Sequence, residues 1–384
     1  MLGAVKRPNR LDRLPEQYFM RLLAQVQAAA AAGGEPLVDL GRGNPDVPPP
    51  QHVVDALTAS ANEHTPRVHG YAPFAGLPEL KQAISARYAD AYGVELDPER
   101  EVAIAPGTKS ALVELVLVVA ERGDTVLLPD PYYPDYPSGV ALAGAELGLL
   151  ELDPGRGYAP RFDLAPRDRV ALVFLNYPSN PTAAVVKEGT FAAAAAFARE
   201  TGAAVVHDFA YGDLVFDGRA PSSFLAEPGA REVGVELFSM SKSFGMAGWR
   251  LGFVVGNAEL VARMTTLQDH VRAGIFTPVQ RAGIAALTGP QESVAERVRL
   301  YERRRDRVLD ELGDLAAPCE GTFYVWLRLP EGLTPERLLD EHRLVVAPGE
   351  GFGPLGRGWA RLSLATADDV LDRGLERLVT AMRG

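Results

Sequence analysis

Lys242 follows a short apolar run, in a loop rich in hydroxyl groups and glycine. Residues 239–250 read SMSKSFGMAGWR, so Arg250 comes eight positions after the lysine. A lysine amine forms an imine with an aldehyde only when it has lost its proton, and partial burial beside another cation lowers its pKa. The segment is therefore a candidate for covalent catalysis, although a bare Ser-x-Ser-Lys pattern is more typical of a surface loop with an exposed lysine.

Polar residues also follow two other apolar runs. Asp208 comes directly after the run 203–207, and Asn180 follows the run 170–175. Ligands in open α/β sheets bind beyond the carboxyl ends of the strands, where we expect these side chains to lie. Alone, Asp208 is equally well read as a helix N-cap, and Asn-Pro-Thr as an ordinary turn. Several such loops, each after its own strand, favour one shared site.

A further loop has the features of an anion-binding turn. Residues 105–110 read APGTKS, with Gly107 directly before a predicted helix that begins at Thr108. Glycine allows close approach to the backbone, and free N–H groups at the start of a helix attract negative charge. We therefore predict a phosphate turn whose backbone amides matter more than the side chain of Lys109, which is equally compatible with facing solvent.

The elements that position these loops alternate between short apolar strands and helices. Seven strands are expected, at residues 102–105, 125–128, 146–150, 170–175, 203–207, 235–239 and 251–255. Nearly continuous apolar strands are typical of a mostly parallel sheet covered by helices on both faces. Helical segments between residues 258 and 312 lead to a mixed pattern over residues 321–382, which predicts a smaller α+β unit.

Together these motifs resemble those of the fold-type I pyridoxal-phosphate enzymes, in the class I and II aminotransferases. The resemblance runs from Gly41 to about Ala365, with six motifs in the family's order. It implies a pyridoxal-phosphate-dependent aminotransferase in which Lys242 binds the cofactor covalently and then shuttles a proton. The implied fold is the α/β fold type I, with a large domain built on a seven-stranded sheet and a smaller α+β domain.

The resemblance also assigns roles to single residues around the cofactor. Asp208 matches the aspartate that keeps the ring nitrogen protonated, and Tyr211 and Asn180 match the partners of the phenolic oxygen. His207 is expected mainly to pack, with stacking or bonding near the ring as the alternative. The residues that match the family's phosphate ligands are Gly107, Thr108, Lys109, Ser239 and Arg250.

Further matches concern ring stacking and the substrate. Tyr133 matches the aromatic residue that stacks on the ring, with Tyr132, Tyr136 or plain packing as alternatives. Arg361 matches the residue that binds the substrate α-carboxylate, a task suited to the two parallel bonds of a guanidinium, with a surface ion pair as the alternative. Gly41 matches a glycine whose backbone closes over the substrate. The resemblance also implies that Asn180 contacts the substrate.

Tyr71 matches a tyrosine that reaches the phosphate of the neighbouring subunit, so the resemblance implies a homodimer with shared active sites. The expected organisation is an N-terminal arm with part of the small domain (1–45), a large cofactor-binding domain (46–289) and a C-terminal small domain (290–384). The first and last segments are expected to share one small domain that moves on the large one.

Residues 207–211 and 274–280 are similar to the alanine and LL-diaminopimelate aminotransferase branch. Arg42 departs from that branch, in which an apolar or neutral residue is expected. Arg42 and Arg272 could each bind a second substrate carboxylate or point to solvent. Because related carbon–sulfur lyases and cyclopropane-forming synthases keep the same lysine, aspartate and arginine, they are the alternative function.

Composition argues against other classes of protein. The chain has a net charge of −11 and a pI of about 5.2, which disfavours a nucleic-acid surface. A single cysteine, Cys319, allows no intrachain disulfide or zinc-binding spacing, and a reducing cytoplasm is the simplest location. No apolar stretch is long enough to span a membrane. No basic helix-turn-helix domain precedes Gly41, and no G-x-G-x-x-G follows a strand as a dinucleotide-binding oxidoreductase requires.

Overall fold

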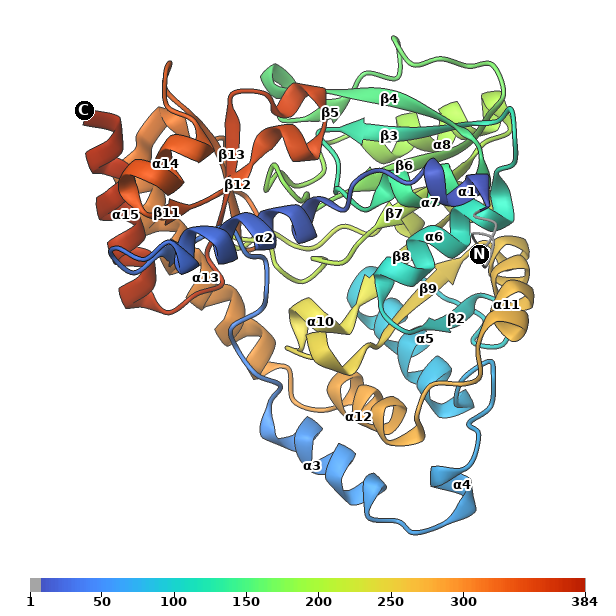
Figure 1. The fold of residues 1–384 in the computed structure, drawn as a ribbon. Coiled ribbons are helices and arrows are strands. Elements are labelled where there is room, and N and C mark those ends of the chain that lie inside the picture. The colour runs from blue at the N-terminus through green and yellow to red at the C-terminus, as the bar shows by residue number, and fades with distance from the viewer. Residues whose placement is uncertain (1–7, 384) are drawn as a thin grey trace, which may run out of the picture.

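The computed structural model describes residues 8–383, so the first seven residues of the predicted 1–45 arm lie outside the described part. Figure 1 shows a large unit built around a broad sheet and a smaller unit that contains the end of the chain. Helix α2 (Tyr18–Ala31) crosses from one unit to the other. Within residues 8–383, no helix is long and apolar enough to cross a membrane.

The large sheet has the strand order β2-β9-β8-β7-β6-β3-β4-β5. Its strands are β2 (Val102–Ala105), β3 (Thr125–Asp130), β4 (Glu146–Asp153), β5 (Ala159–Pro160), β6 (Val170–Asn176), β7 (Ala204–Asp208), β8 (Gly234–Ser239) and β9 (Gly252–Gly256). Adjacent strands from β8 to β4 pair in parallel, whereas β9 is antiparallel to both β8 and β2. The seven predicted strands and the mostly parallel sheet are confirmed. The sequence analysis missed β5, a two-residue edge strand antiparallel to β4.

Helices cover both faces of this sheet because successive strand residues point to opposite sides. Val205 of β7 packs in a cluster with helices α5 (Pro78–Tyr92), α8 (Thr190–Thr201) and α12 (Thr277–Thr288). The next residue, Val206, packs in the opposite cluster with helices α6, α7 and α11. The bounds of these three helices are α6 (Thr108–Val119), α7 (Tyr136–Ala143) and α11 (Ala258–Val271).

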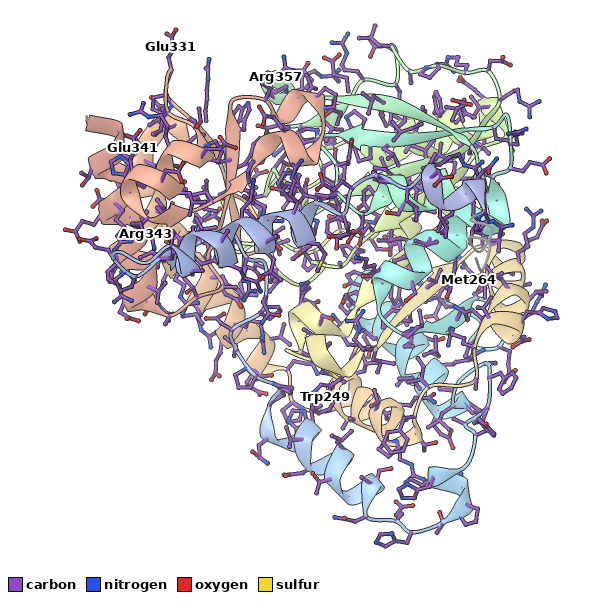
Figure 2. The ribbon with its side chains drawn as sticks, viewed as in Figure 1. Trp249, Met264, Glu331, Glu341, Arg343 and Arg357 are labelled. Atoms are coloured by element: carbon purple, nitrogen blue, oxygen red, sulfur yellow. The ribbon has the colours of Figure 1, made fainter. Side chains whose placement is uncertain are left out.

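The smaller unit combines β1, from the first part of the chain, with the C-terminal segments, whereas α1 (Asn9–Asp12) lies against α7 of the large unit (Figure 1). A three-stranded antiparallel sheet has the order β10-β13-β12, and β1 pairs in parallel with β11. Its elements are β1 (Val38–Asp39), α13 (Glu292–Leu312), β10 (Tyr324–Arg328), α14 (Pro335–His342), β11 (Leu344–Val345), β12 (Ala347–Pro348), β13 (Trp359–Ser363) and α15 (Asp368–Arg383). Figure 2 shows the charged side chains of Glu331, Glu341 and Arg343 on this unit, away from the large sheet. The exact domain boundaries stay a prediction.

Shorter helices complete the described chain. They are α1 (Asn9–Asp12), α3 (Gln51–Ala61), α4 (Pro66–His69), α9 (Ala230–Val233) and α10 (Met240–Ser243). Helix α10 follows β8 directly, so the polypeptide turns from strand to helix at the position of Lys242. Figure 2 shows Trp249, which follows α10, on the side of the large unit where α12 lies.

Candidate active site

Three neighbouring strands of the large sheet end in polar residues at the same edge. Asn176 is the last residue of β6, Asp208 of β7 and Ser239 of β8. A cavity of about 480 Å³ lies at this edge, between the large unit, the small unit and α2. The predicted site residues that line it are Gly41, Thr108, Lys109, Tyr133, Asn180, Asp208, Tyr211, Lys242 and Arg361.

Lys242 presents its amino group to this cavity from α10. Ser239, the N-cap of α10, accepts a hydrogen bond from the backbone N–H of Ser241 and so fixes the start of the turn. Burial lowers the pKa of Lys242 to about 8, and the positive charges of Arg361 and Arg250 contribute to the shift. Lys242 therefore supplies much more uncharged, nucleophilic amine near neutral pH than an exposed lysine does.

Asp208 is buried and accepts two hydrogen bonds. The Tyr136 hydroxyl donates to its Oδ2 over 2.8 Å, and the backbone N–H of Ala210 donates to its Oδ1 over 3.2 Å. Burial raises the pKa of Asp208, and the bond from Tyr136 opposes this effect. The Tyr136 ring itself stacks on Phe174, with ring centres 4.8 Å apart. Tyr136 is thus a partner of Asp208, a role that the sequence analysis missed.

The three tyrosines that were candidates for ring stacking have different positions in the structure. Tyr133 lines the cavity, where its ring centre lies 6.0 Å from that of Phe19 on α2. Tyr136 is occupied with Asp208, and Tyr132 does not line the cavity. The geometry therefore favours Tyr133 among the three for stacking on a bound ring.

Arg361 is buried in the wall of the cavity, with only 1% of its surface exposed. Its Nη1 donates to the side-chain oxygen of Asn180 over 2.8 Å, and its Nη2 donates to the carbonyl oxygen of Gly41 over 3.1 Å. The guanidinium also lies 3.9 Å from the ring centre of Tyr324. Within residues 8–383 its Nε has no hydrogen-bond partner and no carboxylate pairs with it. A buried cation without an anion is suited to an anionic ligand, and burial excludes the alternative of a surface ion pair.

The predicted phosphate turn lies against Arg250. Gly107 precedes α6 with a φ of +84°, and a Cβ at this position would lie 2.1 Å from Nη2 of Arg250. Arg250 donates to the carbonyl oxygens of Pro106 and Ala247 over 3.3 and 2.8 Å. The free N–H groups at the start of α6 and this guanidinium together form a positive surface for an anion. Lys109 instead directs its amine to Asp135, at 2.9 Å.

These features fit pyridoxal phosphate. The cavity offers an amine of lowered pKa for its aldehyde, a buried carboxylate for its ring nitrogen, and a helix start with an arginine for its phosphate. The unpartnered Nε of Arg361 leaves a donor for a substrate carboxylate in the same cavity.

Six further residues considered from the sequence do not line the cavity. Gly107, Ser239 and Arg250 lie outside its lining, next to Thr108, Lys109 and Lys242, and the other three are His207, Arg272 and Tyr71. His207 points to the opposite face of the sheet, where it bonds Glu236 and the carbonyl oxygen of Tyr177, which argues against contact with the ring. Arg272 donates to the carbonyl oxygen of Ile104 over 2.7 Å, a structural contact. Tyr71 is 92% exposed, as a residue that serves a neighbouring subunit would be.

Arg42 does line the cavity, at its rim. Its side chain is exposed, and its Nε lies 3.6 Å from a carboxylate oxygen of Asp39. The position is compatible with contact to a substrate side chain, whereas Arg272 has no such access.

Several cavity residues escaped the sequence analysis. The Tyr324 hydroxyl accepts a hydrogen bond from Tyr211 over 3.1 Å. No local pattern marks Tyr324, because 113 positions separate it from Tyr211 in the chain. Asn176 donates to the carbonyl oxygen of Asp208 and accepts the backbone N–H of Asn180, both over 2.8 Å. The signal for Asn176 was available, since it also ends an apolar strand. Helix α2 adds an apolar wall formed by Phe19, Met20, Leu22, Leu23 and Val26.

The chain is similar to known proteins over nearly its full length. Residues 35–378 match the model of the aminotransferase class I and II family. An L-glutamine–4-(methylsulfanyl)-2-oxobutanoate aminotransferase of Bacillus subtilis is 41% identical over 96% of this chain and 94% of its own. An LL-diaminopimelate aminotransferase of Moorella thermoacetica is 39% identical over 96% of this chain and 97% of its own. The substrate-bound structure of BacF from Bacillus subtilis superposes with a TM-score of 0.92, at 39% identity and 98% coverage of both chains.

These relatives confirm the resemblance to the alanine and LL-diaminopimelate branch, and the solved structures confirm fold type I. The cavity, its lysine and the family match together settle the chemistry of the protein. The chain belongs to the class I and II aminotransferases and is a pyridoxal-phosphate-dependent aminotransferase.

Proposed function

We propose that Lys242, Asp208, Asn180 and Arg361 are the central residues of the aminotransferase reaction in this chain. The observation that carries the proposal is their convergence: all four line one cavity, although they come from four separate segments. Bound pyridoxal phosphate supplies an aldehyde that links to the substrate amine and a ring that takes up electrons from the substrate Cα.

The side chains then have distinct tasks. With pyridoxal phosphate bound, the uncharged amine of Lys242 would take the proton from the substrate Cα and would carry it to the cofactor carbon that bears the aldehyde. Asp208, supported by Tyr136, would hold a proton on the ring nitrogen. Asn180 and Tyr211 would bind the phenolic oxygen, and Tyr133 would stack on the ring. The phosphate would be held by Gly107, Thr108, Ser239 and Arg250, with Lys109 contributing its backbone.

Substrates are α-amino acids and 2-oxo acids, whose carboxylate Arg361 would bind through its two-pronged guanidinium. The side chain of the substrate would extend toward the apolar wall of α2, in the cavity that Arg42 also lines. Two relatives are named for substrates with extended side chains, 4-(methylsulfanyl)-2-oxobutanoate and LL-diaminopimelate. Their names support substrates with an extended side chain for this chain. A third relative, the glutamate-pyruvate aminotransferase AlaC of Escherichia coli, supports glutamate as an amino donor, and 2-oxoglutarate is then its 2-oxo acid product.

We also propose a cytoplasmic homodimer in which the exposed Tyr71 completes the site of the other subunit. Phe74 and Phe276 are exposed as well, at 49% and 48% of their surface. Phe74 lies shortly before α5 and Phe276 is the N-cap of α12, and these two helices contact each other. Exposed aromatic side chains of this kind are typical of contact surfaces between proteins. The proposal is completed by three segments: an N-terminal arm with part of the small domain (1–45), a large cofactor-binding domain (46–289) and a C-terminal small domain (290–384).

A half-reaction tests the proposed activity. A single amino acid is added to the loaded enzyme without a 2-oxo acid, and the absorbance of the cofactor is followed. An aminotransferase converts its cofactor to the amine form once and releases one 2-oxo acid per site. Continuous ammonia and pyruvate from a sulfur amino acid would instead show the lyase alternative. Pyruvate and 2-oxoglutarate, each assayed with a panel of amino acids, then define the substrate pair.

A further inference from the structure

His207 has a buried position directly next to Asp208 but on the other face of the sheet. None of its surface is exposed, and aromatic side chains surround its ring. The ring centres of Phe191 and Phe209 both lie 5.0 Å from that of the imidazole. An imidazole in such an apolar environment requires hydrogen bonds for both of its ring nitrogens.

Both nitrogens of His207 have a partner that accepts hydrogen bonds. Nε2 lies 2.9 Å from the carbonyl oxygen of Tyr177, and Nδ1 lies 2.7 Å from Oε1 of Glu236. A carbonyl oxygen can only accept, so Nε2 carries a proton. Nδ1 faces the Glu236 carboxyl group, and the imidazole donates on its far side to Tyr177.

Glu236 is itself held in place. The hydroxyl of Ser223 donates to its Oε2 over 2.7 Å, and the backbone N–H of Phe224 donates to its Oε1. Glu236 lies on β8 next to β7, where it is the register partner of His207. The imidazole is thus fixed from behind, and its Nε2 is directed at the carbonyl group of Tyr177.

Tyr177 begins the turn that carries Asn180 into the active site. The same turn is bonded on its other side by Asn176, whose amide donates to the backbone oxygen of Asp208 and whose oxygen accepts the N–H of Asn180. Asn180 then accepts a bond from Arg361. Two adjacent residues of β7 therefore hold this turn: His207 through its bond to the Tyr177 carbonyl oxygen, and Asp208 through its own carbonyl oxygen, which accepts from Asn176.

We propose that His207, fixed by Glu236, is a positioning residue that sets the turn bearing Asn180 and so orients Asn180 and Arg361 in the active site. The inference rests on the proposed roles of those two residues. The imidazole touches neither the cavity nor its contents, and it acts through the backbone of Tyr177.

Other ionisable groups near the pair would not replace its function. Burial raises the pKa of both Tyr88 and Tyr92 on α5, and the nearby Glu236 carboxylate adds to this, so both hydroxyls stay neutral. Arg87, one of the two cations of α5, is engaged in an ion pair with Asp213. The imidazole of His207 is therefore the group that supplies the donor for Tyr177.

Two substitutions separate the two hydrogen bonds of the imidazole. In His207→Gln the side-chain amide takes the place of Nε2 and retains the donor for Tyr177. In His207→Asn the amide takes the place of Nδ1, so it retains the contact with Glu236 and loses the donor. Ser223→Ala is the matched control, because it removes one bond to Glu236 without touching the turn.

Three measurements on the loaded enzyme are compared: amide hydrogen exchange in residues 176–184, the pH titration of the cofactor's visible absorbance, and KM with kcat. We expect His207→Asn to speed exchange in this segment roughly tenfold, since one hydrogen bond is lost. It should also shift the absorbance titration and raise KM for the amino acid roughly tenfold. His207→Gln and Ser223→Ala should stay close to the parent in all three.

A merely structural role gives a different result. If His207→Asn and His207→Gln lower the melting temperature alike and leave exchange in 176–184 and the absorbance titration unchanged, the proposal is wrong. If His207→Asn does not fold, His207→Leu replaces it, because it also lacks the donor for Tyr177 while Glu236 keeps its bonds from Ser223 and Phe224. That variant should show the same exchange and absorbance changes, and their absence would equally refute the proposal.

The test is also distinct from that of the proposed function. Faster exchange in residues 176–184 reports on the bond to Tyr177 whatever the substrate is. If Arg361→Ala binds substrate normally while His207→Asn still loosens the turn and shifts the absorbance titration, the assigned role of Arg361 fails and the positioning of Asn180 by His207 stands.

Discussion

Arg361 and Asn180 are joined by a hydrogen bond of 2.8 Å, although 181 positions separate them in the chain. Arg361 lies on β13 of the small unit, whereas Asn180 lies in the turn after β6 of the large sheet. The bond therefore connects the two units at the cavity and holds the guanidinium in one orientation before any substrate arrives. Preorganisation of this kind reduces the cost of ordering the site when the substrate binds.

Replacement of Arg361 should mainly weaken substrate binding. Arg361→Ala removes a buried charged contact to the substrate carboxylate worth roughly 2 to 4 kcal/mol, so KM for both the amino acid and the 2-oxo acid should rise by roughly 30-fold or more. Arg361→Lys is the matched variant, since it keeps the charge and loses the two-pronged geometry. Steady-state kinetics measure the effect. An unchanged KM for both substrates in Arg361→Ala would remove Arg361 from the binding site.

Lys242→Ala should abolish turnover and the absorbance of the covalently bound cofactor, while circular dichroism stays that of a folded protein. The pKa of about 8 makes a second prediction for the parent protein. Because the pKa is lowered, the amine loses its proton as the pH rises through about 8. The rate at which the cofactor-free protein captures pyridoxal phosphate should therefore rise up to that pH and then level off. A rate that keeps rising toward the pKa of an ordinary lysine would contradict the burial of this amine.

Tyr136→Phe tests the support of Asp208. The ring stacking on Phe174 is retained, and only the hydroxyl that donates to Asp208 is lost. That bond lowers the pKa of Asp208, so its loss should raise this pKa and move the acidic limb of the kcat profile to higher pH. We expect kcat to fall roughly tenfold near neutral pH. Tyr132→Phe, outside the cavity, is the control, and identical profiles for the two variants would exclude the role.

Gly107→Ala should weaken binding of the cofactor phosphate. A methyl group at Gly107 would lie 2.1 Å from Nη2 of Arg250 and displace the guanidinium from the turn. Gly93→Ala is a close control, since Gly93 also has a positive φ, +66°, but nothing lies within 4 Å of its added Cβ. Gly93→Ala should lose roughly 1 kcal/mol of stability from its left-handed backbone conformation, and Gly107→Ala should lose more, because its φ of +84° and ψ of 162° lie in a region that is open essentially to glycine alone. Only Gly107→Ala should raise the Kd for pyridoxal phosphate, by roughly tenfold, as measured by fluorescence titration. Equal affinities in the two variants would argue against a phosphate site here.

Mixed subunits test whether Tyr71 serves the neighbouring site. Tyr71→Ala and Lys242→Ala should each be poorly active or inactive alone. If the site is shared, a mixed dimer contains one site with an intact Lys242 from one subunit and an intact Tyr71 from the other, so mixing should restore part of the activity. Size-exclusion chromatography establishes the dimer first. A monomeric protein, or the absence of recovery after the subunits exchange, would refute the shared site.

Much of this architecture was predictable from local patterns. Apolar runs in β6, β7 and β8 identified the strands, because a sheet covered on both faces buries nearly every side chain. The polar residues that end these runs were then placed at one edge by the rule for parallel sheets. Lys242, Asp208 and Asn180 were predicted as site candidates in this way, and the structure brings them to one cavity.

Other features depend on which segments meet in space. The hydroxyls of Tyr132, Tyr133 and Tyr136 are chemically equivalent in the sequence, and only packing decides that Tyr136 bonds Asp208 while Tyr133 faces the cavity. Tyr324 gives no local signal, since its partner Tyr211 lies in a distant segment.

The amino-acid sequence alone determined the positions of the strands along the chain and the polar residues that follow them, because local periodicity and spacing encode those properties. The motifs that these residues form determined the family through their resemblance. Only the tertiary structure decided that Arg361 meets Asn180, that Tyr136 supports Asp208, and that His207 faces away from the cavity toward Glu236. Hydrogen bonds between such distant residues depend on how whole layers pack, and no local pattern carries that information.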